Sequence, residues 1–206
     1  MELLIPIMIF CFATSISPGP NNIMLMTSGV NHGIVKTIPH LLGINIGFPA
    51  MVAAIGFGLG NLFIAFPQIY LVIKVLGITY LLYLAWKIAR SSMPNVGVES
   101  AKPLTFMQAA LFQWVNPKAW VMAVGAIASF TTSEKMVSQI LLIVATYLVV
   151  GGMCIAVWLC AGAAMKQFLQ NEKQLKIFNI VMALLLVASV VPMALVEINV
   201  HTWVNR

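Results

Sequence analysis

Prolines interrupt two long apolar stretches of this chain, one in each half of the sequence. The interruptions are residues 17–22 (SPGPNN) and residues 116–119 (NPKA). Proline has no amide proton, so Pro18, Pro20 and Pro117 each leave the carbonyl four residues earlier without its helical donor. In hydrocarbon such unpaired groups persist only where they line a protein cavity. Paired breaks at corresponding places in two halves are typical of a transporter binding site.

The composition indicates a membrane protein. Of the 206 residues, 61% are hydrophobic and 8% are charged, and aspartate is absent. A soluble domain carries about a quarter charged residues, so the chain is not expected to be a soluble enzyme. The net charge of +6 is attributed to loop lysines that face the cytoplasm, and no nucleic-acid partner is expected.

Hydropathy predicts an all-α integral membrane protein with six transmembrane helices. The expected spans are 3–29, 38–66, 69–89, 106–130, 136–164 and 175–198. We interpret residues 1–206 as a single transporter domain made of two inverted three-helix repeats, about 1–92 and 104–206. The linker contains Pro94, Gly97 and Pro103. The first and fourth helices are expected to be broken at mid-membrane, with Pro18 aligned to Pro117.

The distribution of basic residues predicts the orientation. Seven of them fall in or beside the first, third and fifth loops, against three on the opposite side. Short cytoplasmic loops are enriched in lysine and arginine, so both termini are predicted to be periplasmic. The N-terminus lacks the basic segment of a cleavable signal peptide and is interpreted as the start of the first span.

Each break is expected to start a half-helix with free backbone amides. After Gly19 and after Asn116 the first amides have no intrahelical acceptor, and helix N-termini attract anions. The expected free amides are those of Asn21, Asn22, Ile23, Lys118 and Ala119. The carbonyls freed by the prolines belong to Thr14, Ile16 and Gln113, and they suit an ammonium group. Together these groups predict a site for a zwitterionic α-amino acid.

Lys118 is the most informative single residue because it lies near the middle of the fourth span. A charge at that depth costs at least about 2.5–3.5 kcal/mol on insertion scales. The lysine is therefore expected to be neutral, to face water, to bond to carbonyls or to meet a substrate anion. The alternatives are that the span is shifted so that Lys118 reaches the interface, and that the prolines merely kink their helices.

The full set of candidate substrate-binding residues combines both breaks with polar residues at similar depth. These are Thr14, Ser17, Pro18, Gly19, Pro20, Asn21, Asn22, Asn45, Gln113, Asn116, Pro117 and Lys118. For Asn45 an interhelical hydrogen bond is the favoured role. The GxxxG pair Gly43 and Gly47 is interpreted as a close helix contact, with a sliding surface for alternating access as the alternative. His32 and His40 are interpreted as ordinary loop residues, with a proton-linked role as the alternative.

The cysteines give little support to redox or metal chemistry. Cys11, Cys154 and Cys160 all lie in apolar stretches, and the chain has no CxxC motif and no histidine cluster. We expect no metal site and no cofactor. Three buried free thiols that act as small apolar side chains explain this pattern.

Both break motifs resemble a known family. The segment SPGPNN at 17–22 resembles the signature of the LysE/RhtB family of amino-acid exporters, and QWVNPKA at 113–119 resembles its fourth-helix motif. The block YLAWK at 83–87 is also similar. The resemblance implies an exporter, or antiporter, of amino acids in the bacterial inner membrane, driven by the proton motive force. Assembly into homo-oligomers is left open.

The substrate class follows from the acidic residues. The five glutamates lie at span ends or in loops, so no carboxylate is available for a basic substrate side chain. Neutral amino acids such as homoserine, threonine, leucine or cysteine-like molecules are favoured. Two alternatives are a membrane thiol–disulfide electron-transfer protein and a heavy-metal exporter. The missing fourth-span cysteine argues against the first, and the missing cluster of ligands against the second.

Overall fold

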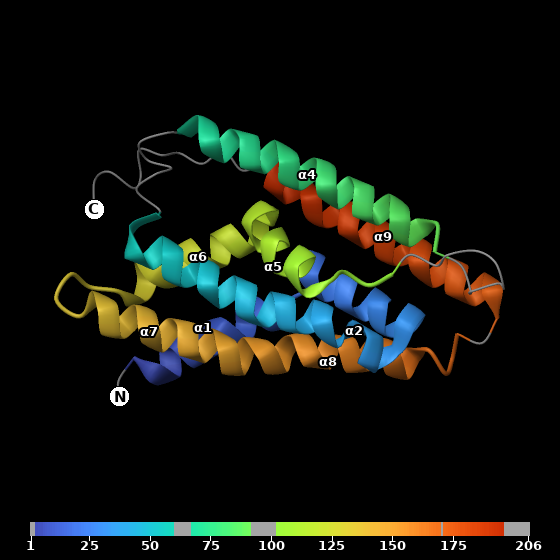
Figure 1. The fold of residues 1–206 in the computed structure, drawn as a ribbon, viewed down its shortest axis with the longest axis horizontal. Helices are drawn as coiled ribbons and strands as arrows, with labels where there is room; N and C mark the ends of the chain where they lie inside the picture. The colour runs from blue at the N-terminus through green and yellow to red at the C-terminus, as the bar shows by residue number, and fades with distance from the viewer. Residues whose placement is uncertain (1–2, 60–66, 92–101, 170, 196–206) are drawn as a thin grey trace.

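The computed structural model describes residues 3–59, 67–91, 102–169 and 171–195, and within these ranges it is helical without strands. Most helices run along the long axis of the molecule (Figure 1). The elements are α1 (Leu4–Ile16), α2 (Pro20–Ala54), η1 (Ile55–Leu59), α4 (Pro67–Ala89), α5 (Phe106–Val115), α6 (Pro117–Phe130), α7 (Met136–Thr146), η2 (Tyr147–Gly151), α8 (Gly152–Met165) and α9 (Glu172–Leu195).

Helix α2 is two helical segments joined at Gly33. Gly33 has φ 77° and ψ 177°, a conformation that glycine adopts without the cost that a Cβ would impose. The segments 20–32 and 34–54 fold back on each other at this turn (Figure 1). The predicted loop between the first two spans is therefore a tight turn. His40 was expected to be a loop residue, but it is buried inside the second segment.

The remaining predicted spans fall on helices. The third, 69–89, lies within α4; the fourth, 106–130, corresponds to α5 and α6; and the fifth, 136–164, corresponds to α7, η2 and α8. The sixth, 175–198, begins within α9. The predicted ends at residues 66 and 198, and the linker residues Pro94 and Gly97, lie outside the described residues.

Length and composition single out two helical stretches as long and apolar enough to cross a membrane. They are Pro20–Leu59, with 40 residues, and Met136–Met165, with 30. Shorter apolar helices are Leu4–Ile16, Val75–Ala89 and Pro117–Phe130. Because the first stretch turns back at Gly33, it does not form one straight passage.

Small residues allow α2 to approach its neighbours closely. The helix packs most extensively on α8 and then on α5, whereas α4 and α9 pack mainly on each other. A Cβ added at Gly47 would lie 2.6 Å from the Ala110 Cα of α5, and one at Gly29 would lie 2.6 Å from the Leu159 carbonyl oxygen of α8. The interpretation of Gly47 as a close-contact position is confirmed, as expected for small residues between membrane helices.

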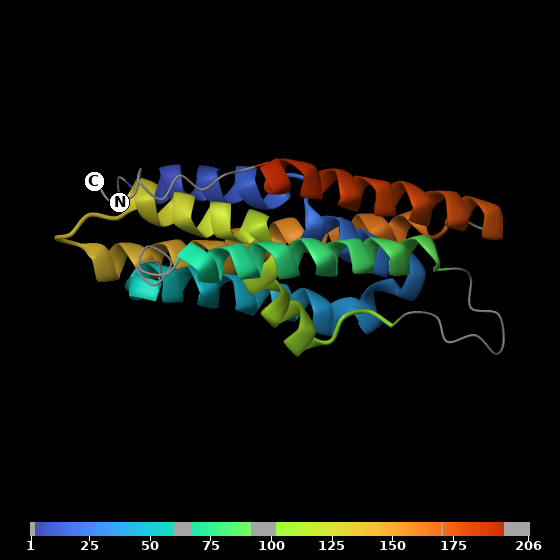
Figure 2. The same cartoon turned by 90° about the horizontal axis from the view of Figure 1, so that it is seen from above.

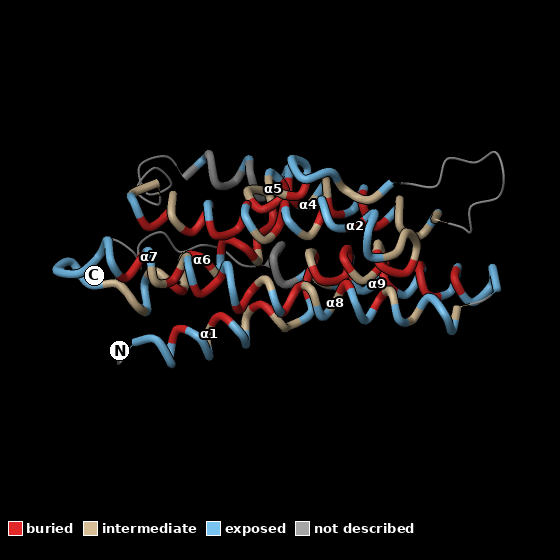
Figure 3. Tube along the Cα trace, turned by 60° about the horizontal axis from the view of Figure 1, so that its bottom comes forward, coloured by how far each residue is buried: buried red, intermediate tan, exposed pale blue. Residues whose placement is uncertain are grey.

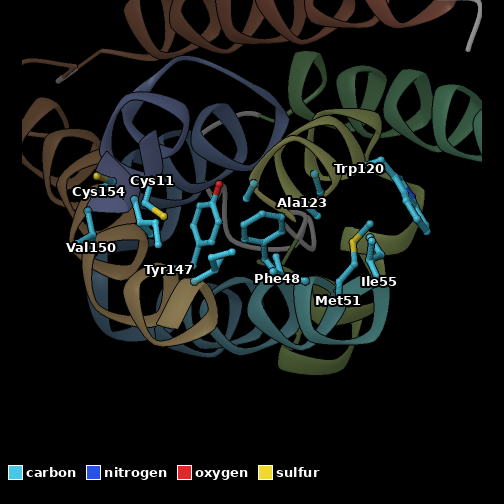
Figure 4. Packing of buried hydrophobic residues seen from close by; sticks show 14 residues of the cluster. Cys11, Phe48, Met51, Ile55, Trp120, Ala123, Tyr147, Val150 and Cys154 are labelled. Carbon is cyan, nitrogen blue, oxygen red and sulfur yellow. The ribbon is translucent and has the colours of Figure 1, made fainter. Parts of the chain in front are cut away.

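The buried apolar residues form two main clusters with polar side chains between them. Cluster one includes Cys11 of α1, Ala119 of α6 and Tyr147 of η2 (Figure 4). Cluster two includes Ile23 of α2 and Phe112 of α5. From α1 to the first segment of α2 the chain passes from cluster one to cluster two, whereas from α5 to α6 it passes from cluster two to cluster one. Both breaks therefore lie between the clusters, and they are traversed in opposite directions.

The outer faces of the helices are apolar. Buried and exposed residues alternate along most helices, with the buried faces turned inward (Figure 3). Exposed residues include Ile5 of α1, Val121 of α6 and Leu184 of α9, each more than three-fifths exposed. A soluble monomer rarely exposes large apolar patches, and these exposed side chains suit contact with lipid.

The helix ends and turns lie in two groups, one at each end of the molecule. The Gly33 turn, the ends of α4 and α8 and the start of α9 lie at one end, and the turn between α6 and α7 lies at the other (Figures 1 and 2). The first group holds the lysines and arginine of the odd-numbered loops, and we call it the basic end. Its described basic residues are Lys36, Lys87, Arg90, Lys102, Lys166, Lys173 and Lys176.

Candidate functional site

The first break separates α1 from α2. Helix α1 ends at Ile16, the next residues are extended, and α2 begins at Pro20 with Gly19 as its N-cap. Proline suits this first helical position because its fixed φ is already helical and no donor is lost there. The second break is shorter: α5 ends at Val115, Asn116 is extended, and α6 begins at Pro117.

The helix starts correct the expected alignment of the two breaks. Pro20 and Pro117 are the first residues of α2 and α6, with Gly19 and Asn116 as N-caps. Pro20, and not Pro18, is therefore the local counterpart of Pro117. Pro18 belongs to the extended connection, which the second break lacks.

The carbonyls that the prolines free are not vacant, contrary to the expectation from sequence. Ser17 Oγ donates to the Thr14 carbonyl at 2.9 Å, and Trp158 Nε1 donates to the Ile16 carbonyl at 3.0 Å. The Gln113 carbonyl accepts from the Asn116 amide at 3.3 Å. Each lost helical bond is replaced inside the protein, so these carbonyls do not form a ready site for a substrate ammonium.

Most of the expected free amides are also paired. In the second break, Asn116 Oδ1 accepts from the Lys118 amide at 3.1 Å, and the Asn116 carbonyl accepts from the Ala119 amide at 3.0 Å. In the first break, the Ile23 amide donates to the Gly19 carbonyl at 2.9 Å. This leaves the first turn of α2 without a cap, because Gly19 provides no side-chain acceptor for Asn21 and Asn22.

Lys118 connects the two breaks. Its Nζ donates to the Ser17 carbonyl at 2.8 Å, to Ser17 Oγ at 2.8 Å and to the Pro18 carbonyl at 3.2 Å. Three acceptors match the three donors of an ammonium group. The acceptors follow the C-terminus of α1, the negative pole of that helix. Of the roles expected for Lys118, bonding to carbonyls is the one that the structure shows.

Gly19 lies against the Lys118 side chain. A Cβ added there would lie 2.6 Å from Lys118 Cδ and 2.9 Å from its Nζ. The ammonium group therefore sits beside the uncapped start of α2, which is the positive pole of that helix. The Lys118 ammonium group and the positive pole of α2 are therefore neighbours. The negative pole of α1 is already paired with the same ammonium group.

The side chains of two asparagines form hydrogen bonds that fix the conformation of the first break. Asn22 Nδ2 donates to the Ser15 carbonyl at 2.7 Å and to the Ser17 carbonyl at 2.8 Å. Asn21 and Gln113 exchange amide hydrogen bonds at 2.8 and 3.2 Å, which ties α2 to α5. These bonds satisfy polar groups that would otherwise be costly to bury.

A cavity opens between the breaks and has a volume of about 470 Å³, including the part that is open to the outside. Seven of the twelve predicted residues line it: Thr14, Gly19, Asn21, Asn22, Asn45, Asn116 and Lys118. The other five, Ser17, Pro18, Pro20, Gln113 and Pro117, surround it without lining it. Of these, Ser17, Pro18 and Gln113 hold lining residues through the hydrogen bonds given above.

Sequence reasoning missed Tyr147, which lines the cavity from the π-helical turn η2. Its hydroxyl lies 3.3 Å from Thr14 Oγ1, which itself donates to the Phe10 carbonyl at 2.7 Å. Either hydroxyl can be the donor in the contact between Tyr147 and Thr14. Its ring meets Phe48 edge-on, with 4.8 Å between centroids (Figure 4). The sequence signal that could have identified Tyr147 is a hydroxyl group in the middle of an apolar span. Its position in a π-helical turn agrees with a functional role, because such turns are frequent at functional sites.

Asn45 lines the cavity and carries an unsatisfied acceptor. Its Oδ1 is buried and has no hydrogen-bond partner within the described part of the chain. The favoured interpretation of Asn45 as an interhelical hydrogen bond is not supported by this oxygen. Apolar wall residues that sequence reasoning also missed are Ile44, Phe48, Met122 and Ile155.

Comparison with known proteins identifies the family. Residues 12–194 match the family described as LysE type translocator. The chain belongs to that family. It is 32% identical to cysteine/O-acetylserine efflux proteins of Escherichia coli (strain K12), Shigella flexneri and Shigella sonnei (strain Ss046), with 86% of this chain and 90% of each relative covered. No solved structure matches it. The relatives are named as efflux proteins and not as enzymes.

The cysteines of this LysE type translocator are free thiols. Cys11 of α1 and Cys154 of α8 are buried, as expected. The expectation of a buried thiol is wrong for Cys160, which is exposed on α8. Cys154 Sγ lies 4.0 Å from the Phe12 carbonyl oxygen. Within the described ranges, no group of three or more histidine, cysteine or acidic residues is placed to hold a metal ion.

Proposed function

We propose that this translocator exports small neutral amino acids from the cytoplasm and binds them as zwitterions in the cavity between the two breaks. The observation that carries the proposal is the pairing of Lys118 with the uncapped start of α2. The negative pole of α1 is filled by the protein's own ammonium group. The remaining local field is positive, and it favours a carboxylate.

The substrate carboxylate is assigned to the amides of Asn21 and Asn22 and to Lys118. These three residues line the same cavity, and Gly19 leaves room for the Lys118 side chain beside the start of α2. A carboxylate that arrives there replaces the longest bond of Lys118, the one to the Pro18 carbonyl at 3.2 Å. A charge-assisted bond to a carboxylate is stronger than the neutral bond that it replaces.

The substrate ammonium is assigned to Asn45 Oδ1. This oxygen is the buried acceptor of the cavity that has no partner among the described residues. The apolar wall then faces the substrate side chain. None of the described lining residues is acidic, which disfavours lysine and arginine as substrates. The relatives' names point to cysteine and O-acetylserine, two neutral amino acids that fit this arrangement.

The membrane arrangement is part of the proposal. Six spans in two inverted repeats, broken at mid-membrane, are supported by the opposite directions in which the chain crosses the two breaks. The basic end is assigned to the cytoplasm of a bacterial inner membrane, and both termini to the periplasm. We further propose that the proton motive force drives export, as the family resemblance implies.

Uptake into inverted membrane vesicles tests these assignments. Vesicles with and without the protein are given labelled cysteine, O-acetylserine, homoserine, threonine, leucine or lysine, with and without a pH gradient. We expect uptake of neutral amino acids that a protonophore abolishes. Uptake equal to that of control vesicles for every compound would refute transport of these amino acids, preference for lysine would refute the substrate class, and insensitivity to the protonophore would refute proton coupling.

A further inference from the structure

A second cavity lies toward the basic end and is not explained by the central site. Its volume is about 500 Å³, including the part that is open to the outside. Lysine and histidine side chains line it together with hydroxyl and amide groups, and none of its described lining residues is acidic. The basic residues are His32, His40, Lys87 and Lys102. Such a lining favours an anionic group.

The first segment of α2 lines both cavities. Its start contributes Asn21 and Asn22 to the central cavity. Its following turns contribute to the second cavity with the three- and four-residue spacing of one helix face. These residues are Met24, Thr27, Ser28, Asn31 and His32. Asn21 is three residues before Met24, so a single face runs from the central cavity into the second.

The second segment of α2 repeats this arrangement. His40 lines the second cavity, and Ile44 and Phe48, four and eight residues later, line the central one. Four helical residues span about 6 Å along the axis. The two cavities are therefore about one helical turn apart along both segments.

Side chains separate the cavities at that turn. The reciprocal amide pair of Asn21 and Gln113 spans α2 and α5, with bonds of 2.8 and 3.2 Å. Met24 follows on the same face and is 4% exposed. The pair and the methionine can move without breaking a helix, because the groups that separate the cavities are all side chains.

His40 gives independent support for a ligand in the second cavity. The side chain is 1% exposed, and its Nε2 has no hydrogen-bond partner within the described residues. Its Nδ1 lies 3.5 Å from Ser28 Oγ. A buried polar atom without a partner is costly, so this nitrogen is suited to a guest. Lys87 stands at the same cavity, with its ammonium group 5.7 Å from the centre of the exposed Tyr83 ring.

We propose that the second cavity is a cytoplasmic vestibule that binds the carboxylate of the amino acid before it passes the Asn21–Gln113 pair into the central site. This inference rests on the proposed function. Lys87 attracts the carboxylate, and His40 and the hydroxyl groups of the α2 face orient it. The substrate then moves about one helical turn toward the central site, where its carboxylate leaves Lys87 and binds Lys118.

Transport kinetics give the first test. In inverted vesicles the cytoplasmic face is outward, so the vestibule meets added substrate first. Loss of one charge-assisted bond in Lys87→Gln is expected to raise the KM for O-acetyl-L-serine about tenfold while Vmax stays near wild type. Lys36→Gln removes an exposed lysine of the same end that lines neither cavity, and it should behave like the wild type. An unchanged KM in Lys87→Gln overturns the vestibule.

Chemical labelling separates the vestibule from the central site. Ser91 lines the second cavity, so Ser91→Cys is treated with a membrane-impermeant maleimide in inverted vesicles, and the label is measured at that residue by mass spectrometry. O-acetyl-L-serine should slow labelling several-fold even when Lys118→Gln disables the central site, whereas ethanolamine, which lacks a carboxylate, should not. Absence of protection overturns the vestibule, and full transport by Lys118→Gln instead contradicts the central site.

A lipid headgroup is the competing anion, and vesicle composition distinguishes it. Purified protein is reconstituted in phosphatidylcholine alone or with phosphatidylglycerol. A rise in the KM of Lys87→Gln in both compositions supports a free carboxylate as the ligand. If the rise occurs only with the anionic lipid, the cavity serves a headgroup and the vestibule assignment is wrong.

Discussion

Replacement of Lys118 by glutamine gives the most direct check on the central site. The ammonium group donates to three oxygens at 2.8, 2.8 and 3.2 Å. In the proposed complex one of these bonds is exchanged for a bond to the substrate carboxylate. A hydrogen bond to a charged group contributes about 1.5–3 kcal/mol, and 1.4 kcal/mol corresponds to a factor of ten. Lys118→Gln is therefore expected to weaken amino-acid binding about 10- to 100-fold.

The assay is the concentration dependence of uptake into inverted vesicles, with membrane-inserted protein measured in the same preparation. Lys36→Gln provides the matched control because it removes an exposed charge that lines neither cavity. Ser17→Ala tests the hydrogen bonds that hold the Lys118 ammonium group, since it removes one of the three acceptors and leaves both carbonyls in place. Its effect should be smaller than that of Lys118→Gln. Wild-type affinity in Lys118→Gln at normal protein levels would refute the assignment of the carboxylate.

Three further substitutions address the surroundings of Lys118. Gly19→Ala should reduce transport because the new Cβ would lie 2.6 Å from Lys118 Cδ; Gly125→Ala, which meets its nearest atom at 3.5 Å, is the control, and equal transport rates would contradict this reasoning. Asn116→Ala should lower stability by about 1 kcal/mol through loss of the N-cap, measured by thermal unfolding in detergent. Asn116→Ser should restore stability, and transport below the wild-type rate in this stable variant would show a ligand role for the amide. Tyr147→Phe should keep the fold but change substrate affinity, and identical uptake kinetics would remove its hydroxyl from the site.

The positions of the breaks were predictable from sequence because proline acts locally. The helices end and restart at Pro20 and Pro117, in agreement with the missing amide protons. Asn116 was expected as an N-cap, and its side chain accepts from the Lys118 amide. These features depend only on residues a few positions away in the chain, so they can be predicted from the sequence.

The partners of the freed backbone groups were not predictable. Trp158 is 142 residues from the Ile16 carbonyl that it satisfies, and Lys118 is 101 residues from Ser17. Such contacts depend on how the helices pack, and hydropathy does not determine which polar side chain faces a given gap. For the same reason the sequence suggested two equivalent anion sites. Of the two helix starts concerned, the structure caps that of α6 with Asn116 and leaves that of α2 without a side-chain cap.

Tyr147 and His40 show a second limit of sequence reasoning. Each side chain has an ordinary alternative role, as an interface aromatic or as a loop histidine. Their importance comes from placement: Tyr147 lies on a π-helical turn beside Thr14, and His40 is buried because Gly33 turns the chain within a single residue. The sequence alone does not distinguish a glycine with positive φ, such as Gly33, from one that permits close helix contact, such as Gly47.

The electrostatics of the central cavity rank its ligands. An amine without a carboxylate meets Lys118 and the positive pole of α2 and gains no compensating contact there. A carboxylic acid without an ammonium group satisfies that pole but leaves Asn45 Oδ1 unpaired, at a cost of about 1–3 kcal/mol for a buried acceptor. A zwitterion satisfies both, and its side chain meets the apolar wall. The proposed selectivity for neutral amino acids thus requires no acidic side chain among the described lining residues, because helix poles and one lysine supply the charge pattern.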